Sequence, residues 1–190
     1  MCGRARLSSD VGEIKIAFGI PPSRPSPNFA ASWNVAPTDP LPVVRYDAKD
    51  HQRSLEVMRW GLIPFWAKDE KIGFSTINAR AEEVDTKPAF REPFRQRRCL
   101  VPVENFYEWK KIDGGKQPYA IGLKGGGLMA LAGLWKLGDP GPPANASAAS
   151  RSSPPSRTNS APNCTTVCPS FSRPKPGRHG LVRNPRTRRS

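Results

Sequence analysis

The sequence predicts a mixed α+β domain over residues 1–137, in which an antiparallel curled sheet or partial β-barrel carries short helices at its side. Strand-like apolar runs repeat along this stretch, and Gly-containing connections separate them, which is typical of antiparallel sheets. A helix-capping signal lies near the N-terminus. The composition changes after Leu137, so we expect the domain to be truncated there and followed by a disordered basic tail over residues 138–190.

The first predicted element is a short helix that begins after Asp10. Asp10 with Glu13 three residues later matches a capping box, in which each side chain accepts a hydrogen bond from the other residue's backbone N–H. Val11, Ile14 and Phe18 are then available to pack against a sheet.

Further runs are predicted as strands, because apolar residues dominate or alternate in them. They cover residues 42–46, 55–60, 99–103, 106–110, 118–123 and 128–135. Asp113-Gly114-Gly115 and Gly125-Gly126-Gly127 lie in two of the connections and favour hairpins. Residues 88–98 are helix-like, but Pro93 within them favours a break or kink.

Charge is distributed unevenly along the chain. Of the net charge of +14, residues 138–190 contribute +8, from nine Lys and Arg against the single Asp139. The same stretch holds ten of the 22 prolines and shows no apolar period. Such a segment cannot bury enough apolar surface to offset its ordering entropy.

The bulk properties exclude several classes of protein. A chain of 190 residues suits one domain, and no long apolar run predicts a membrane helix. Four irregularly spaced cysteines do not resemble a secreted disulfide framework, so a cytoplasmic protein is expected. A pI near 10.2 indicates a polyanionic partner such as nucleic acid.

Cys2 directly follows the initiator Met1, which is normally removed before a small residue. A chain that begins with cysteine carries a thiol and an α-amine on adjacent carbons, with reference pKa values of about 8.5 and about 7.7–8.0. Such an aminothiol can condense with an aldehyde to a Schiff base and close to a thiazolidine. The alternative is that Cys2 is a tolerated residue in a frayed terminus.

Five short strings in fixed order resemble the SOS-response-associated peptidase family, whose members shield and process abasic sites in DNA. They are Met1–Arg4, Trp33–Pro37, Trp60–Trp66, Ile77–Glu82 and Val103–Trp109. The resemblance covers residues 1–137. It implies that Cys2 captures the ring-opened abasic sugar as a thiazolidine crosslink during the response to DNA damage.

The resemblance also implies roles for two further catalytic residues. Asn78 would hold the terminal amine and the sugar oxygens through its neutral amide. Glu108 would shuttle protons during ring opening and Schiff-base formation. From the residues alone, Asn78 could equally cap a helix over residues 79–84, and Glu108 could be a solvent-facing strand residue.

The expected partner is single-stranded DNA that contains an abasic site, bound by a monomer at the bacterial nucleoid. The DNA-binding candidates are Arg4, Asn34, Pro37, Trp66 and Arg80. The arginines suit phosphates, Trp66 suits the gap left by the missing base, and Asn34 and Pro37 would shape the pocket wall. The arginines between Arg91 and Arg98 could contact phosphates or form an ordinary solvated face. Trp60 is expected in the core.

One part of the family pattern is missing. The family places a histidine late in the domain, whereas this chain has only His51 and His179, and neither matches. Read with a one-base shift, the codons allowed from Asn163 onward permit E-L-H-D-R-M-P-V-V-L, which is the missing string. We therefore hypothesise a frameshift between about Leu137 and Arg157. Such a chain would lack the last strands of its barrel, expose a sheet edge and react less efficiently.

The sequence is also compatible with two other functions. A cysteine N-terminal-nucleophile peptidase or amidase would use the Cys2 thiol with its own amine as base. A basic nucleic-acid-binding module would use no chemistry at all. No organic cofactor is expected, and Cys164, Cys168 and His179 lack the spacing of a metal site.

Overall fold

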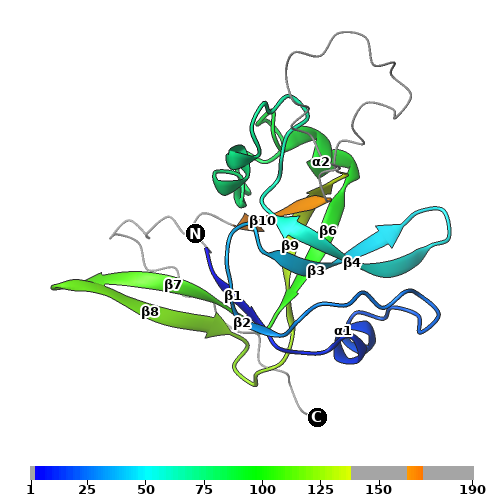
Figure 1. Ribbon diagram of the computed structural model, residues 1–190, viewed down its shortest axis with the longest axis horizontal. Helices are drawn as coiled ribbons and strands as arrows, with labels where there is room; N and C mark the ends of the chain where they lie inside the picture. Colours follow the sequence, from blue (N-terminus) through cyan, green and yellow to red (C-terminus); the bar gives the residue numbers. More distant parts are fainter. Residues whose placement is uncertain (1–2, 138–161, 169–190) are drawn as a thin grey trace, which may run out of the picture.

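The computed structural model, which describes residues 3–137 and 162–168, contains two sheets (Figure 1). Their strands are β1 (Ala5–Leu7), β2 (Ser32–Val35), β3 (Pro40–Asp47), β4 (Gln52–Trp60), β5 (Asn78–Arg80), β6 (Arg98–Val103), β7 (Asn105–Ile112), β8 (Gly115–Gly122), β9 (Met129–Lys136) and β10 (Asn163–Cys168). The larger, six-stranded sheet has the order β4-β3-β6-β9-β10-β5, and the four-stranded sheet has the order β2-β1-β7-β8. The two sheets share a core cluster, in which Ala5 and Val35 of the smaller sheet pack with residues of the larger one. The predicted α+β class with a curled, partly closed sheet is confirmed.

The larger sheet curls into a barrel because β10 pairs with β4 as well as with β9. Strands β4, β3, β6, β9 and β10 therefore form a closed ring, and apolar side chains of these strands fill it. Trp60, Met58, Val43 and Val101 are each at most 2 % exposed. Trp60 is a core residue, as expected, and its indole Nε1 donates to the carbonyl oxygen of Ile77 at 2.9 Å.

The predicted capping box is present at helix α1 (Val11–Ala17). The Asp10 carboxylate accepts from the Glu13 backbone N–H at 2.8 Å, and the Glu13 carboxylate accepts from the Asp10 N–H at 3.0 Å. Ile14 and Phe18 then pack against Leu7 and Leu55 in the core. This helix begins where the local sequence predicts it to begin.

Helix α2 (Arg91–Gln96) forms despite Pro93. Pro93 is the third residue of the helix, and the first four backbone N–H groups of any helix have no intrahelical partner. The ring therefore removes no helical hydrogen bond, and the predicted break does not occur. A further helical turn of 3-10 type, η1 (Glu70–Phe74), was not predicted.

The two glycine-rich connections behave differently. Gly114, at φ +80°, closes the predicted hairpin between β7 and β8. The second connection is no hairpin, because β8 belongs to the smaller sheet and β9 to the larger one. Gly126 and Gly127, at φ +73° and +85°, instead turn the chain from one sheet into the other, where β9 pairs with β6.

The segment predicted as a tail contains a strand. Residues 163–168 form β10, whose β-branched Thr165, Thr166 and Val167 suit a pleated sheet, although the Pro- and Arg-rich surroundings obscure this signal. The sheet edge that we expected to be exposed after Leu137 is therefore covered by β10. The remaining predicted tail, 138–161 and 169–190, lies outside the described residues. Within the described part, no helix has the length and apolar character needed to span a membrane.

Candidate functional site

The chain enters the smaller sheet beside Glu108. The backbone N–H of Tyr107 donates to the carbonyl oxygen of Arg4 at 2.9 Å, and Ala5 pairs with Phe106. This contact brings the start of the described chain to Tyr107, the residue that directly precedes Glu108. Cys2, the predicted nucleophile, lies outside the described residues and is two residues before Arg4 in the sequence.

Arg4 and Asn34 contact each other directly. The Nη1 of Arg4, which directly precedes β1, donates to the Oδ1 of Asn34 on β2 at 3.1 Å. Ala5 and Val35, their neighbours along the chain, are buried, so alternation turns Arg4 and Asn34 away from the core. Two of the predicted DNA-binding residues thus form one polar unit on the outer side of the sheet.

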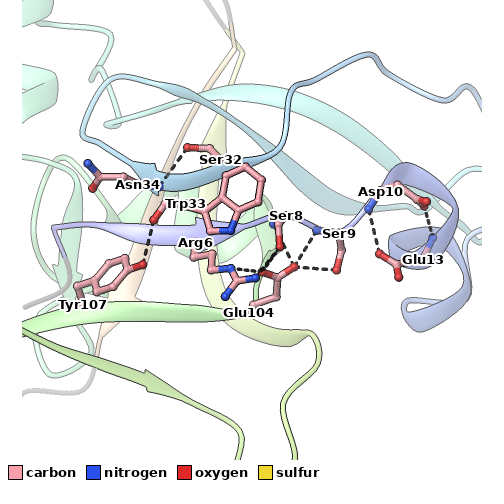
Figure 2. A network of polar contacts seen from close by, with 10 residues as sticks. All are labelled: Arg6, Ser8, Ser9, Asp10, Glu13, Ser32, Trp33, Asn34, Glu104 and Tyr107. Carbon is pink, nitrogen blue, oxygen red and sulfur yellow. Dashed lines mark hydrogen bonds and ion pairs between the residues drawn. The ribbon is translucent and has the colours of Figure 1, made fainter.

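Figure 2 shows how β1 and β2 are held against β7. The hydroxyl group of Tyr107 donates to the Trp33 carbonyl oxygen at 2.9 Å. Ser8 and Ser9 each donate a backbone N–H and a hydroxyl to the Glu104 carboxylate, at 2.7 to 3.0 Å. The Arg6 Nε lies 3.0 Å from the same carboxylate.

The pKa of Glu104 reflects this surrounding. Burial acts to raise the pKa of the carboxyl, but the hydrogen bonds from Ser8 and Ser9 outweigh it and lower the pKa below its ordinary value. Glu104 was not among the residues predicted from the sequence, although it lies in the same string as Glu108. The adjacent serines Ser8 and Ser9 were the available signal, because paired hydroxyl and amide donors suit a carboxylate.

Asn78 lies on β5, at the edge of the larger sheet, and does not cap a helix: a strand and then turns occupy residues 78–87. Its Oδ1 accepts from the Thr166 hydroxyl at 2.6 Å, and β5 and β10 pair in parallel at these two residues. Thr166 also lines a narrow apolar cavity of about 10 Å³ together with Ala5. Thr166 was not among the residues predicted from the sequence, because it lies in the predicted tail.

The other predicted DNA-binding residues lie on separate segments. Arg80, two residues beyond Asn78, has a 57 % exposed side chain whose guanidinium is 3.9 Å from the Glu83 carboxylate. Trp66 is 48 % exposed and borders an open depression of about 590 Å³ with Lys68 and Lys71. Pro37 is half-buried in the connection between β2 and β3. None of these segments belongs to the smaller sheet that holds Arg4 and Glu108.

The basic cluster around α2 is only partly free for a ligand. Arg91, Arg95 and Arg98 are exposed, whereas the Arg97 guanidinium donates to the Glu92 carboxylate at 2.7 and 2.8 Å. In residues 3–137 and 162–168, no three His, Cys, Asp or Glu side chains converge as they would to hold a metal ion.

Two buried thiols are poor candidates for chemistry. Burial raises the pKa of Cys99 to about 12, despite the opposing charge of Arg45. Burial also raises the pKa of Cys164 well above its ordinary value, and the nearby Cys99 adds to this effect. A thiol must ionise to be a nucleophile, so these two side chains act as core residues.

A sequence model of the family described as SOS response associated peptidase (SRAP) matches residues 1–156. Among curated proteins, the abasic site processing proteins YoqW and YoaM of Bacillus subtilis (strain 168) are 44 % and 45 % identical to the chain over 137 residues. These alignments cover 72 % of the chain, which thus spans about 60 % of the length of those relatives. The abasic site processing protein HMCES of Gallus gallus is 33 % identical over 140 residues, which cover 64 % of the chain and 42 % of that protein.

Solved structures share the fold. A protein from Bacteroides thetaiotaomicron matches with a TM-score of 0.66 at 22 % identity and covers 87 % of the chain and 67 % of its own. A protein from Bordetella bronchiseptica matches with a TM-score of 0.62 at 19 % identity and covers 87 % of the chain and 71 % of its own. At such identities, the likeness concerns the fold alone.

Proposed function

The chain belongs to the SOS response associated peptidase (SRAP) family, and we propose on this basis that it processes abasic sites in DNA. The bacterial relatives that match it at 44 % and 45 % identity are named abasic site processing proteins. The observation that carries the proposal is the backbone contact of Arg4 with Tyr107 where the chain enters β1, because the expected reactive terminus then starts two residues before a contact with the neighbour of Glu108.

The proposed reaction uses the terminal aminothiol of Cys2 after removal of Met1. The amine adds to the C1′ aldehyde of the ring-opened abasic sugar, and loss of one water molecule gives a Schiff base. The sulfur then adds to the same carbon, and the thiol proton passes to nitrogen, which yields a thiazolidine. Glu108 gives and takes the protons of these steps, since a positioned carboxyl group can do both.

Asn78 orients the terminal amine and the sugar in this scheme. The Thr166 hydroxyl donates to the Asn78 Oδ1 at 2.6 Å, which turns the amide nitrogen toward other acceptors. A neutral amide in this position holds the nucleophile without protonating it. Thr166 therefore supports Asn78 from the adjacent strand.

Single-stranded DNA at the bacterial nucleoid is the proposed substrate, bound by a monomer. Arg4 and Arg80 suit phosphate oxygens, Asn34 contacts Arg4 where the chain enters the sheet, and Pro37 would shape the pocket wall from the connection after β2. The exposed indole of Trp66 can stack where a base is missing. An abasic site has no base edge to read, so a protein can recognise only the DNA backbone and the gap where the base is missing. The arginines would contact the backbone, and Trp66 would occupy the gap.

We further propose that residues 1–137 are an incomplete SRAP domain and that residues 138–190 arise from a shifted reading frame. The absence of the family histidine from the sequence supports this, and it predicts slower proton transfer in the reaction. The coding DNA provides the test. A one-base shift should restore the histidine-containing string, and stop codons in that frame would exclude the idea.

A denaturing gel tests the proposed chemistry. The protein is mixed with matched single-stranded DNA with and without one abasic site, and then denatured. A covalent product should form on abasic DNA only, vanish in Cys2→Ser and vanish when extra residues precede Cys2. Glu108→Gln should slow its formation by roughly 10²- to 10⁴-fold.

The same gel separates the alternatives. If Cys2→Ser retains abasic DNA as well as the unchanged protein does, the chain is a binding module without chemistry. An acyl adduct of Cys2 with a peptide or amide substrate, with no product on abasic DNA, would indicate an N-terminal-nucleophile peptidase instead.

A further inference from the structure

Strands β7 and β8 form a two-stranded ribbon that projects from the body of the molecule (Figure 1). Residues that face each other in an antiparallel pair point to the same side, with Cβ atoms about 5 Å apart. Glu108 faces Tyr119 in this ribbon. The tyrosine therefore lies on the same face as the carboxyl group, within one residue width of it.

The side chain of Tyr119 is available to a ligand. It is 50 % exposed, and within the described part of the chain its hydroxyl forms no hydrogen bond and its ring packs against no other ring. Toward the body of the molecule, this ribbon face carries Phe106, which is partly buried and packs on the core, and its partner Ile121, which is 43 % exposed. Tyr119 is thus the first aromatic ring on that face beyond the core.

A positive charge follows on the same face. The pair next to Glu108 and Tyr119, toward the tip of the hairpin, consists of Lys110 and Gln117. Lys110 is exposed. An open aromatic ring beside a lysine is the combination with which proteins hold single-stranded nucleic acid, because bases stack on the ring and the cation contacts the phosphate.

We propose that Tyr119 is the stacking platform for the base next to the abasic site. This deepens the proposed function and rests on it, because Glu108 must then lie at the reacting sugar. The missing base leaves its neighbour without a stacking partner on one side, and the ring of Tyr119 takes that place. Lys110 contacts the phosphate of the same nucleotide, which holds the reacting sugar over Glu108.

Fluorescence anisotropy with two labelled single-stranded oligonucleotides tests this. The first contains one tetrahydrofuran abasic analogue, which has no aldehyde and cannot crosslink. The second contains three in a row, so both neighbouring bases are absent. Tyr119→Ala should weaken binding to the first by roughly 5- to 150-fold and leave binding to the second unchanged.

Tyr119→Phe keeps the ring and should bind both oligonucleotides as the unchanged protein does. Tyr46→Ala is the matched control, because Tyr46 is also exposed, at 59 %, but lies on β3 of the other sheet. Equal losses on both oligonucleotides, or no loss on either, overturn the proposal. A Phe variant as weak as the Ala variant also overturns it, because the hydroxyl and not the ring would then matter.

The readout does not depend on covalent chemistry. If Tyr119→Ala weakens binding to the first oligonucleotide alone but the unchanged protein forms no covalent product on genuine abasic DNA, the stacking role stands and the proposed reaction fails. If a covalent product forms and anisotropy shows no dependence on Tyr119, the reaction stands and the stacking role fails.

Discussion

A single carboxylate anchors the start of the chain to the smaller sheet. Glu104 accepts hydrogen bonds from both Ser8 and Ser9, and only 13 % of its side chain is exposed. These two serines connect β1 to α1, so the contact fixes the direction in which the chain leaves β1. Hydrogen bonds to a charged group are among the stronger ones in proteins. Glu104 therefore positions both β1, which precedes the two serines, and α1, which follows them.

Replacing Glu104 with Gln should lower the free energy of unfolding at neutral pH by about 1.5–3 kcal/mol, because the charge-assisted bonds are lost. The pKa of Glu104 is lowered by folding, so its contribution is fully present above the ordinary value of 4.5 and is lost as the pH falls through the lowered value. Urea midpoints measured from neutral pH downward should therefore converge for the two proteins in acid. Glu92→Gln, at a half-exposed ion pair, should change stability by at most about 0.5 kcal/mol. A constant gap at all pH values would contradict the assigned role.

At the scale of elements, β9 is the strand on which the larger sheet depends. It lies between β6 and β10 in the sheet. Its residue Gly133 pairs with Cys99 of β6 on one side and with Thr166 of β10 on the other. A Cβ atom at Gly133 would lie 2.9 Å from the Cys99 Sγ and 3.1 Å from the Thr165 carbonyl oxygen. No flexible side-chain end is available there to move aside.

Gly133→Ala should consequently destabilise the protein by about 1–3 kcal/mol, as overpacking of a close-packed interior does. Gly115→Ala on β8 is the matched control, since a Cβ there meets nothing within 4 Å. Thermal unfolding followed by circular dichroism measures both. Equal midpoints for the two variants would show that β6, β9 and β10 are packed less closely than described here.

Elements whose cause is local could be predicted from the sequence, whereas those whose cause is distant could not. The capping box of Asp10 and Glu13 determines where α1 starts, and Gly114 determines the β7–β8 turn. The pairing of β9 with β6 is set by strands that are distant in the sequence, and the local glycines do not reveal it. The prediction of a hairpin at Gly125–Gly127 was therefore wrong. The site shows the same division: Asn78 and Glu108 lie in recognisable strings, while Thr166 reaches Asn78 only through the pairing of β5 with β10.

At the scale of the whole molecule, a short segment closes the barrel. Residues 162–168 accept hydrogen bonds from the backbone N–H groups of Arg59 and Gly61, at 3.0 and 2.6 Å. The Asn163 Oδ1 accepts from the Ile63 N–H at 2.9 Å. Cys164 and Thr165 are fully buried. The β4 end and the β5 strand, which carries Asn78, are therefore both held by residues from much later in the chain.

A chain shortened to end at Leu137 should lose its cooperative unfolding transition and self-associate, because β4 and β9 would then present open edges. Size-exclusion chromatography and urea unfolding measure this against the full chain. Asn163→Ala offers a milder test, with an expected cost of about 1–3 kcal/mol because the Ile63 N–H, in a half-buried position, loses its acceptor. A shortened chain that stays monomeric with an unchanged midpoint would show that β10 does not stabilise the barrel.

The position of β10 in the chain also sets the order of events during synthesis. A ribosome extends a chain at about 5–20 residues per second, and domains tend to fold as they emerge. Here β4 appears early, but its pairing with β10 must wait for Asn163 and Cys164, more than 100 residues after Trp60. During that interval the β4 edge of the nascent chain stays unpaired, which makes this stage a natural point for chaperone capture.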